Sequence, residues 1–172
     1  MRQMSHGLSG DQPAAERMVS MQAANTQTLA PAHGLACGTK VMTLEGEMPV
    51  EFLLPGDRVL TRSGARVLRD VTVTVLQDVE VVLISAETLG VDRPVDDMIV
   101  LPRQMVMVRD WRAPALCGGK AGMVAAERLT DGEYIRAARL PDLRLFTLGF
   151  DAAEVVYAGG LELGCPAITV AA

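Results

Sequence analysis

The stretch that decides the fold runs from residue 48 to residue 61 and reads MPVEFLLPGDRVLT. Its centre, Leu54-Pro55-Gly56-Asp57, predicts a type II turn, because proline presets φ at the second position and glycine supplies the positive φ of the third. Arg58 to Thr61 then leads away from the turn as an extended segment. This pattern is typical of short strands joined by tight turns.

Further extended runs follow the same pattern along the chain. The predicted strands are residues 39–44, 58–61, 71–75, 80–85, 98–101, 104–108, 134–137, 143–150 and 154–158. Valine alternates with threonine from Val71 to Val75, which indicates a half-buried strand. Pro102 marks a corner between two runs, a tight turn is expected at 45–47, and one helical turn is expected at 124–129. The sequence therefore predicts an all-β fold of short antiparallel strands with little helix.

Residues 1–33 differ from the rest of the chain in composition. They are rich in Gln, Ala, Ser, Thr and Met, and the spacing of apolar residues between Ala14 and Ala30 predicts only a weak helix. We interpret residues 1–33 as a mobile N-terminal leader, with a docking segment as the alternative. Residues 34–172 are expected to form one folded domain.

Composition narrows the function classes. The chain has 172 residues, 49% of them apolar, which is enough for a real core. A net charge of -5 with 3% aromatic residues argues against nucleic-acid binding. The sequence contains neither an apolar run of about 20 residues nor the apolar stretch of a signal peptide. A membrane span is therefore not expected, and the cytoplasm is the default location, with leaderless export left open.

Histidine and asparagine are scarce. The histidines are His6 and His33, the sole asparagine is Asn25, and neither type occurs from residue 34 onward. That stretch therefore lacks a histidine base, a Cys/His dyad and a histidine-ligated metal. The three cysteines, Cys37, Cys117 and Cys165, are widely spaced and form no CxxC pair. No metal and no cofactor are expected.

Four segments together resemble one family. They are GTKVMT at 38–43, the stretch at 48–61, VRDWRA at 108–113, and the run from Phe150-Asp151 through VVYAGG at 155–160. In combination they resemble the Hint (hedgehog/intein) domain in its short bacterial form, over about residues 34–165. The resemblance implies a compact all-β horseshoe with a central autoprocessing site. In that family an opening cysteine forms a thioester with the preceding residue, and a Ser/Thr-x-x-His string and later histidines assist.

The positions that carry this chemistry in the family are replaced here. Gly34 stands where the resemblance places the nucleophilic cysteine. Leu101 and Gln104 stand at the hydroxyl and the histidine of the assisting string. Thr147 and Ala153 match the histidines near the last strands, and the asparagine of splicing members has no counterpart. The resemblance therefore implies a degenerate active site.

Three hypotheses follow. The first is a degenerate Hint domain without autoprocessing, a structural or interaction module whose partner is an unknown protein or its own leader. The alternative is an active, self-cleaving cysteine autoprotease, in which Cys37 attacks the carbonyl of Ala36 and releases the leader. The third is a ligand- or peptide-binding β module that uses strand 143–150 or an unpaired sheet edge.

Two further residues have alternative interpretations. Asp57 is either an active-site carboxylate or a turn residue whose side chain caps nearby backbone N–H groups, and we favour the turn. Trp111 is either a surface anchor or a packed core residue, and we favour packing.

Overall fold

The computed structural model describes residues 31–168, and its strands form two sheets. The strands are β1 (Leu35–Ala36), β2 (Lys40–Thr43), β3 (Gly46–Pro49), β4 (Arg58–Thr61), β5 (Gly64–Val67), β6 (Asp70–Ile84), β7 (Met98–Val100), β8 (Met105–Val108), β9 (Gly122–Ala125), β10 (Ile135–Gly149), β11 (Glu154–Ala158) and β12 (Leu161–Cys165). The helical segments are η1 (Val50–Phe52), α1 (Ala113–Cys117) and η2 (Ala126–Leu129). Every pairing between these strands is antiparallel, so the all-β prediction is confirmed.

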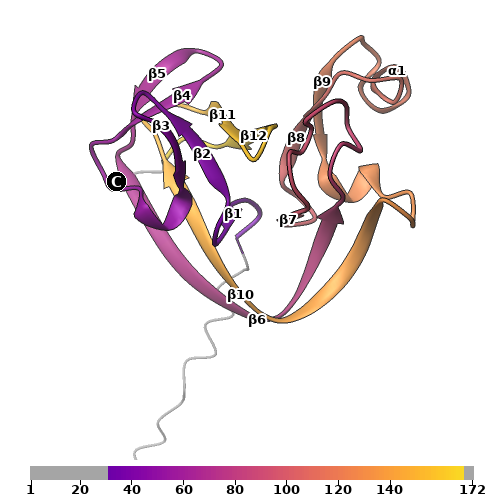
Figure 1. Ribbon diagram of the computed structural model, residues 1–172, viewed down its shortest axis with the longest axis horizontal. Coiled ribbons are helices and arrows are strands. Elements are labelled where there is room, and N and C mark those ends of the chain that lie inside the picture. The colour runs from indigo at the N-terminus through magenta and orange to yellow at the C-terminus, as the bar shows by residue number, and fades with distance from the viewer. Residues whose placement is uncertain (1–30, 169–172) are drawn as a thin grey trace, which may run out of the picture.

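Two strands of 15 residues, β6 and β10, form the frame. They pair from Ile135 opposite Ile84 to Gly149 opposite Asp70. Figure 1 shows the pair bending at its base and rising into both arms of a horseshoe. The prediction of short strands was wrong here. The predicted runs 71–75 and 80–85 fall on one strand that ends at Ile84, and the runs 134–137 and 143–150 fall on one strand that spans Ile135–Gly149.

The interruption that suggested separate strands lies at the middle of the pair. Pro141 stands there in β10 and lacks a backbone N–H, so it adds no donor to the ladder. Asp78, at the matching place in β6, has a φ of +49°. The register is the same on both sides of these two residues. The pattern in the sequence is therefore broken although the strands continue.

The two sheets share one main core. The first has the order β1-β10-β6-β7, and the second runs β3-β2-β4-β11-β12-β8-β9, with β5 beside β4. Valines, isoleucines and leucines from both sheets are almost fully buried in this core; they include Val41, Val59, Ile84, Ile135, Val156 and Leu163. Because successive side chains of a strand point to opposite faces, each sheet buries the side chains of one face in this core.

The turn at the centre of the stretch 48–61 forms as predicted. The Asp57 amide donates to the Leu54 carbonyl at 3.1 Å, and Gly56 has a φ of +103°. Two local predictions were displaced. The β2–β3 turn lies at 44–45 rather than 45–47, and residues 124–129 contain the end of β9 followed by the 3-10 segment η2. The sequence did not predict the short elements β1, β3, η1, β5, α1 and β12.

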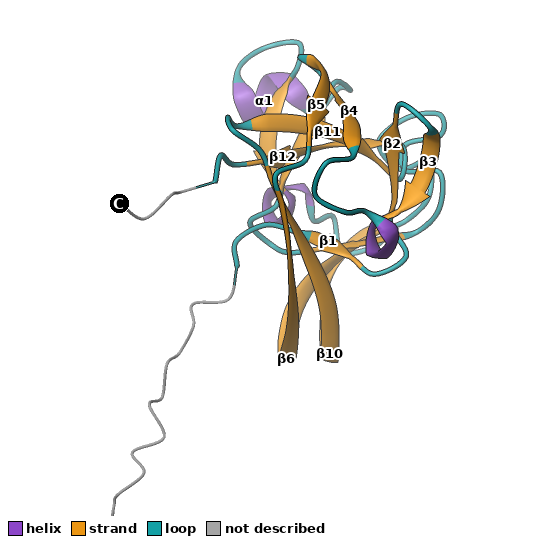
Figure 2. Cartoon of the chain, turned by 90° about the vertical axis from the view of Figure 1, so that its left-hand side faces the viewer, coloured by secondary structure: helices purple, strands orange, loops and turns teal. Residues whose placement is uncertain are grey.

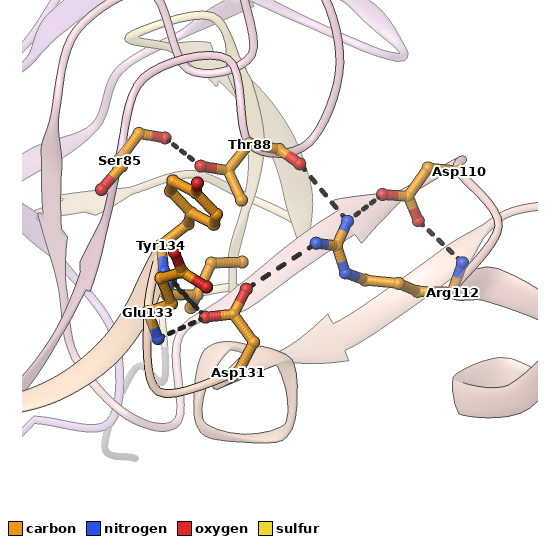
Figure 3. Close-up of polar contacts among 8 residues, drawn as sticks. Ser85, Thr88, Asp110, Arg112, Asp131, Glu133 and Tyr134 are labelled. Carbon is orange, nitrogen blue, oxygen red and sulfur yellow. Dashed lines mark hydrogen bonds and ion pairs between the residues drawn. The ribbon is translucent and has the colours of Figure 1, made fainter.

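Arg112 ties together three loops of one arm, as Figure 3 shows. Its guanidinium pairs with Asp110, donates to the Thr88 carbonyl at 3.3 Å and lies 4.0 Å from the Asp131 carboxylate. Asp131 in turn accepts three backbone N–H groups, from residues 133–135, each at 2.9 Å. These backbone bonds hold the pKa of Asp131 below its ordinary value, and nearby Arg112 adds to the effect.

Trp111 lies beside this group of contacts and is 81% exposed. The packed-core interpretation of Trp111 was therefore wrong. The Arg112 guanidinium lies 4.9 Å from the centre of the indole ring, within the range of a cation–π contact.

Candidate functional site

Gln104 organises the place where the sequence predicted a replaced histidine. It ends the turn from Leu101 to Gln104, where its own N–H donates to the Leu101 carbonyl at 3.0 Å, and the residue is only 1% exposed. Its Oε1 accepts the Gly34 N–H at 3.0 Å, and its Nε2 donates to the carbonyls of Gly164 at 2.9 Å and Met105 at 3.1 Å. An uncharged amide does not exchange a proton near neutral pH. Gln104 therefore binds three strand-end segments together and offers no general base.

Gly34, the position that the resemblance aligns with the family's cysteine, has no room for a side chain. Its φ of +150° is a conformation that side chains rarely adopt. A Cβ built on Gly34 would lie 2.7 Å from both Cγ and Cδ2 of Leu145. The space that a cysteine would need at this position is occupied by Leu145, which is itself 1% exposed.

Leu101 lies in the same apolar region. It is 2% exposed and belongs to a second buried cluster, which consists of Ala36, Val79, Val81, Leu101, Leu143 and Leu145. A serine or threonine hydroxyl at this position would need a hydrogen-bond partner, and an apolar cluster provides none. The structure thus brings Gly34, Leu101 and Gln104 together around Leu145.

The other two positions of the resemblance lie beside this group. Thr147 is next in register to Gly34, one pair beyond Leu35 and Phe146, and Ala153 lines a pocket together with His33, Arg103 and Gly164. Thr147 is half-buried on β10, opposite Thr72 of β6. Ala153 is exposed just before β11. Among the hydrogen bonds of residues 31–168, none joins Thr147 or Ala153 to Gly34 or Gln104.

A pocket of about 380 Å³ next to Ala153 was missed by the sequence analysis. His33, Glu154 and Cys165 all line it. Its parts are not arranged as a reactive set, because Glu154 is held by Thr61 Oγ1 and by Arg66, each at 3.0 Å. Burial, with a contribution from Glu154, raises the pKa of Cys165 to about 12, so this thiol stays protonated at neutral pH. Burial also lowers the pKa of His33.

One signal for this pocket was present in the sequence. Gly159-Gly160 is a two-residue hairpin turn, and counting outward from it places Glu154 opposite Cys165. Nothing in the sequence spacing indicates that His33, about 120 residues away, lies beside them.

Cys37 lies at an exposed turn directly after β1. Its N–H donates to the Arg144 carbonyl at 3.0 Å, and the Ala36 carbonyl accepts the Thr39 N–H at 3.1 Å. The Ala36–Cys37 peptide is therefore part of an ordered, hydrogen-bonded turn. Leu35 is 2% exposed, so the residues before the bond belong to the core. Cleavage at Cys37 would separate β1, the edge strand of the four-stranded sheet, from the rest of the chain.

Glu51 is an acid–base group beside Cys37. The Gly38 N–H donates to Glu51 Oε2 at 2.8 Å, and the Cys37 side chain lies near the same carboxylate. These contacts, led by the Gly38 bond and with Arg144 nearby, lower the pKa of Glu51. A carboxylate with a lowered pKa is a poor base for a thiol.

Asp57 is engaged locally. Its Oδ2 accepts the Leu54 N–H at 2.8 Å, which is the contact expected of a turn residue. It lines a separate pocket with Thr43, Met48 and Arg58, away from the group around Leu145. Within residues 31–168, no three histidine, cysteine or acidic side chains are placed to hold a metal ion. The same part of the chain contains no helix that is long and apolar enough to cross a membrane.

Comparisons with known proteins agree with this architecture. The family model of the Hint domain matches residues 33–164. A bacterial intein-like domain from Clostridium thermocellum is 14% identical, with a TM-score of 0.55 over 77% of this chain and 97% of that chain. The gp41-1 intein is also 14% identical, with a TM-score of 0.51 over 77% and 98%.

A third solved structure is a splice-inactive variant of the AceL NrdHF class 3 split intein. It is 15% identical, with a TM-score of 0.51 over 78% of this chain and 99% of that chain. At these identities the likeness concerns the fold alone. No curated protein matches the sequence.

Proposed function

The chain belongs to the Hint domain family, and on that premise we propose that it is a degenerate Hint domain, without autoprocessing activity, that acts as a structural or interaction module. The observation that carries the proposal is the group formed by Gly34, Gln104 and Leu145. Gln104 uses its amide to hold Gly34 in place, and Leu145 fills the space beside Gly34.

The chemistry of the family requires groups that are absent at these positions. In an N-to-S acyl shift a thiolate attacks the preceding carbonyl carbon, the C–N bond breaks, and the amine leaves with a proton. Gly34 has no thiol, and neither Leu101 nor Gln104 can deliver a proton. Loss of general acid–base assistance alone costs about 10²–10⁴-fold in rate.

The alternative, an active cysteine autoprotease that uses Cys37, has its exposed thiol in favour. Two contacts weigh against it. The amide of the bond to be cut donates to the Arg144 carbonyl, and the carboxylate beside the thiol, Glu51, has a lowered pKa and is a poor base. We therefore assign neither Cys37 nor Asp57 a catalytic role.

A module without its own chemistry acts through its surface. We retain two kinds of partner, another protein and the chain's own residues 1–33. Trp111, at 81% exposure and stacked by Arg112, is suited to anchor a protein partner, because tryptophan is enriched at binding hot spots. Pro31 and Ala32 line a pocket beside Leu101 and Pro102, so the leader enters the domain at this surface.

Hydroxylamine trapping tests the absence of autoprocessing. Any acyl shift to a cysteine forms a thioester, which hydroxylamine cleaves, and the chain lacks the Asn-Gly sequence that hydroxylamine also cuts. We expect the parent and its Cys37→Ala variant to stay intact to the same extent. A fragment that begins at residue 37 in the parent and is missing in Cys37→Ala would contradict the proposal.

A further inference from the structure

One edge of the long strand β6 is unpaired from Asp70 to Val81. β10 covers one side of β6 from Asp70 to Ile84, whereas β7 covers the other side only at residues 82–84. Within residues 31–168, no backbone hydrogen bond reaches residues 71–77 from this second side. Figure 2 shows the β6–β10 pair extending away from the other strands.

The usual protection against pairing is absent between residues 71 and 77 of this edge, and charged residues stand only at the two ends of this segment, Asp70 and Asp78. Residues 71–77 read VTVTVLQ, with no charge, glycine or proline. Val73 is 47% exposed and Val75 is 59% exposed. Edges of this kind are ordinarily shielded by charged residues, proline or bulges, because their free N–H and C=O groups pair readily with another strand.

The sequence of the edge is complementary to itself. The five residues Val71 to Val75 read VTVTV and are symmetric about Val73. In an antiparallel pair centred there, Val73 meets Val73 of a second copy. Valine then meets valine and threonine meets threonine at every position of this segment, which are favourable cross-strand combinations.

Charges at the ends of the edge favour this register over its neighbour. With Val73 at the centre, Asp70 lies opposite Leu76 of the second copy. With Thr74 at the centre, Asp70 would lie opposite Asp78, and like charges directly opposite destabilise a strand pair. Each copy has one such edge, so a two-fold pairing consumes both and does not continue into a fibre.

We propose that residues 71–77 of β6 form a dimerisation edge, which pairs with the same edge of a second copy in antiparallel register about Val73. The two four-stranded sheets then join across a two-fold axis into one continuous sheet. This inference does not depend on whether the domain has lost its autoprocessing activity.

A charge at the centre of the edge tests the proposal. Val73→Lys places two lysines opposite each other on the two-fold axis, whereas Val91→Lys introduces the same change at a valine that is 84% exposed in a loop. Analytical ultracentrifugation of the full chain is expected to show a dimer for the parent and for Val91→Lys, and a monomer for Val73→Lys at the same concentration. A monomeric parent, or a dimer that Val73→Lys leaves unchanged, would overturn the proposal.

Disulfide cross-linking tests the register in a background where Cys37 and Cys117 are serine. Strand partners opposite each other are close enough for a disulfide, so Val73→Cys is expected to give a covalent dimer on mild oxidation. Thr72→Cys is the matched control, because residue 72 lies opposite 74 and meets no second thiol. Efficient cross-linking by Thr72→Cys and not by Val73→Cys would overturn the assigned register.

Hydrogen exchange distinguishes two possible occupants of this edge, a second copy of the chain and the chain's own leader. A dimer protects the amides of residues 71–77 increasingly as protein concentration rises. Protection that does not change with concentration, in a monomeric chain, would assign the edge to residues 1–30 and overturn the proposal.

Discussion

At the scale of single residues, Gln104 holds the site together, because its buried side-chain amide forms hydrogen bonds with three backbone groups. Its replacement with alanine leaves the Gly34 N–H and the Gly164 carbonyl without this partner. We expect Gln104→Ala to lower the free energy of unfolding by about 1–3 kcal/mol, measured by urea denaturation. The neighbouring, exposed Arg103→Ala serves as control and is expected to stay within about 0.5 kcal/mol of the parent. Equal effects of the two variants would show that the Gln104 bonds do not stabilise the fold.

Gly34 gives a second prediction at this scale. Gly34→Cys restores the thiol of the family but forces a side chain against Leu145 at an unfavourable φ. We expect it to destabilise the protein by about 1–3 kcal/mol and to produce no cleavage. Adding Leu145→Ala should restore space, so the double variant should lose less stability than the sum of the single losses. Additive losses would contradict the packing account.

The three cysteines give a third prediction at the scale of single residues. Cys37 and Cys117 are exposed and Cys165 is buried, with the pKa of its thiol raised to about 12. We expect a thiol reagent at neutral pH to label Cys37 and Cys117 in the native protein and Cys165 only after denaturation, with peptide mapping as the measurement. Rapid native labelling of Cys165 would show that its pocket opens.

At the scale of elements, the loop that Asp131 closes predicts a dependence on pH. The pKa of Asp131 is lower in the folded protein than its ordinary value of 3.8. The stabilisation is therefore fully present above pH 3.8 and is lost as the pH falls through the lower, folded value. Asp131→Asn removes the charge next to Arg112, so we expect a lower denaturation midpoint than the parent at pH 7. The two midpoints should converge in acid, and a constant difference at every pH would contradict this account.

The long strands mark the limit of prediction at this scale. The turn at 54–57 was predictable because proline and glycine act locally. The continuity of β6 and β10 was not predictable, because Asp78 interrupts the sequence pattern of β6 and Pro141 interrupts that of β10. Only their mutual pairing carries the two strands through the bend.

At the scale of the whole molecule, the horseshoe was predictable from the family resemblance, whereas the replacement of the family's catalytic positions at Gly34, Leu101 and Gln104 stays a prediction. The sequence could not predict that Leu145 occupies the space beside Gly34, because Leu145 lies 111 positions after Gly34 in the sequence. The predicted bounds 1–33 and 34–172 remain predictions, since residues 1–30 and 169–172 lie outside the described part of the chain.

The central claim is that this Hint domain keeps its fold without cutting its own chain. The most direct measurement is the intact mass of the purified full-length chain before and after a day with excess dithiothreitol at neutral pH. We predict an unchanged mass. A fragment that corresponds to residues 37–172 would contradict the claim and would identify Cys37 as a working nucleophile.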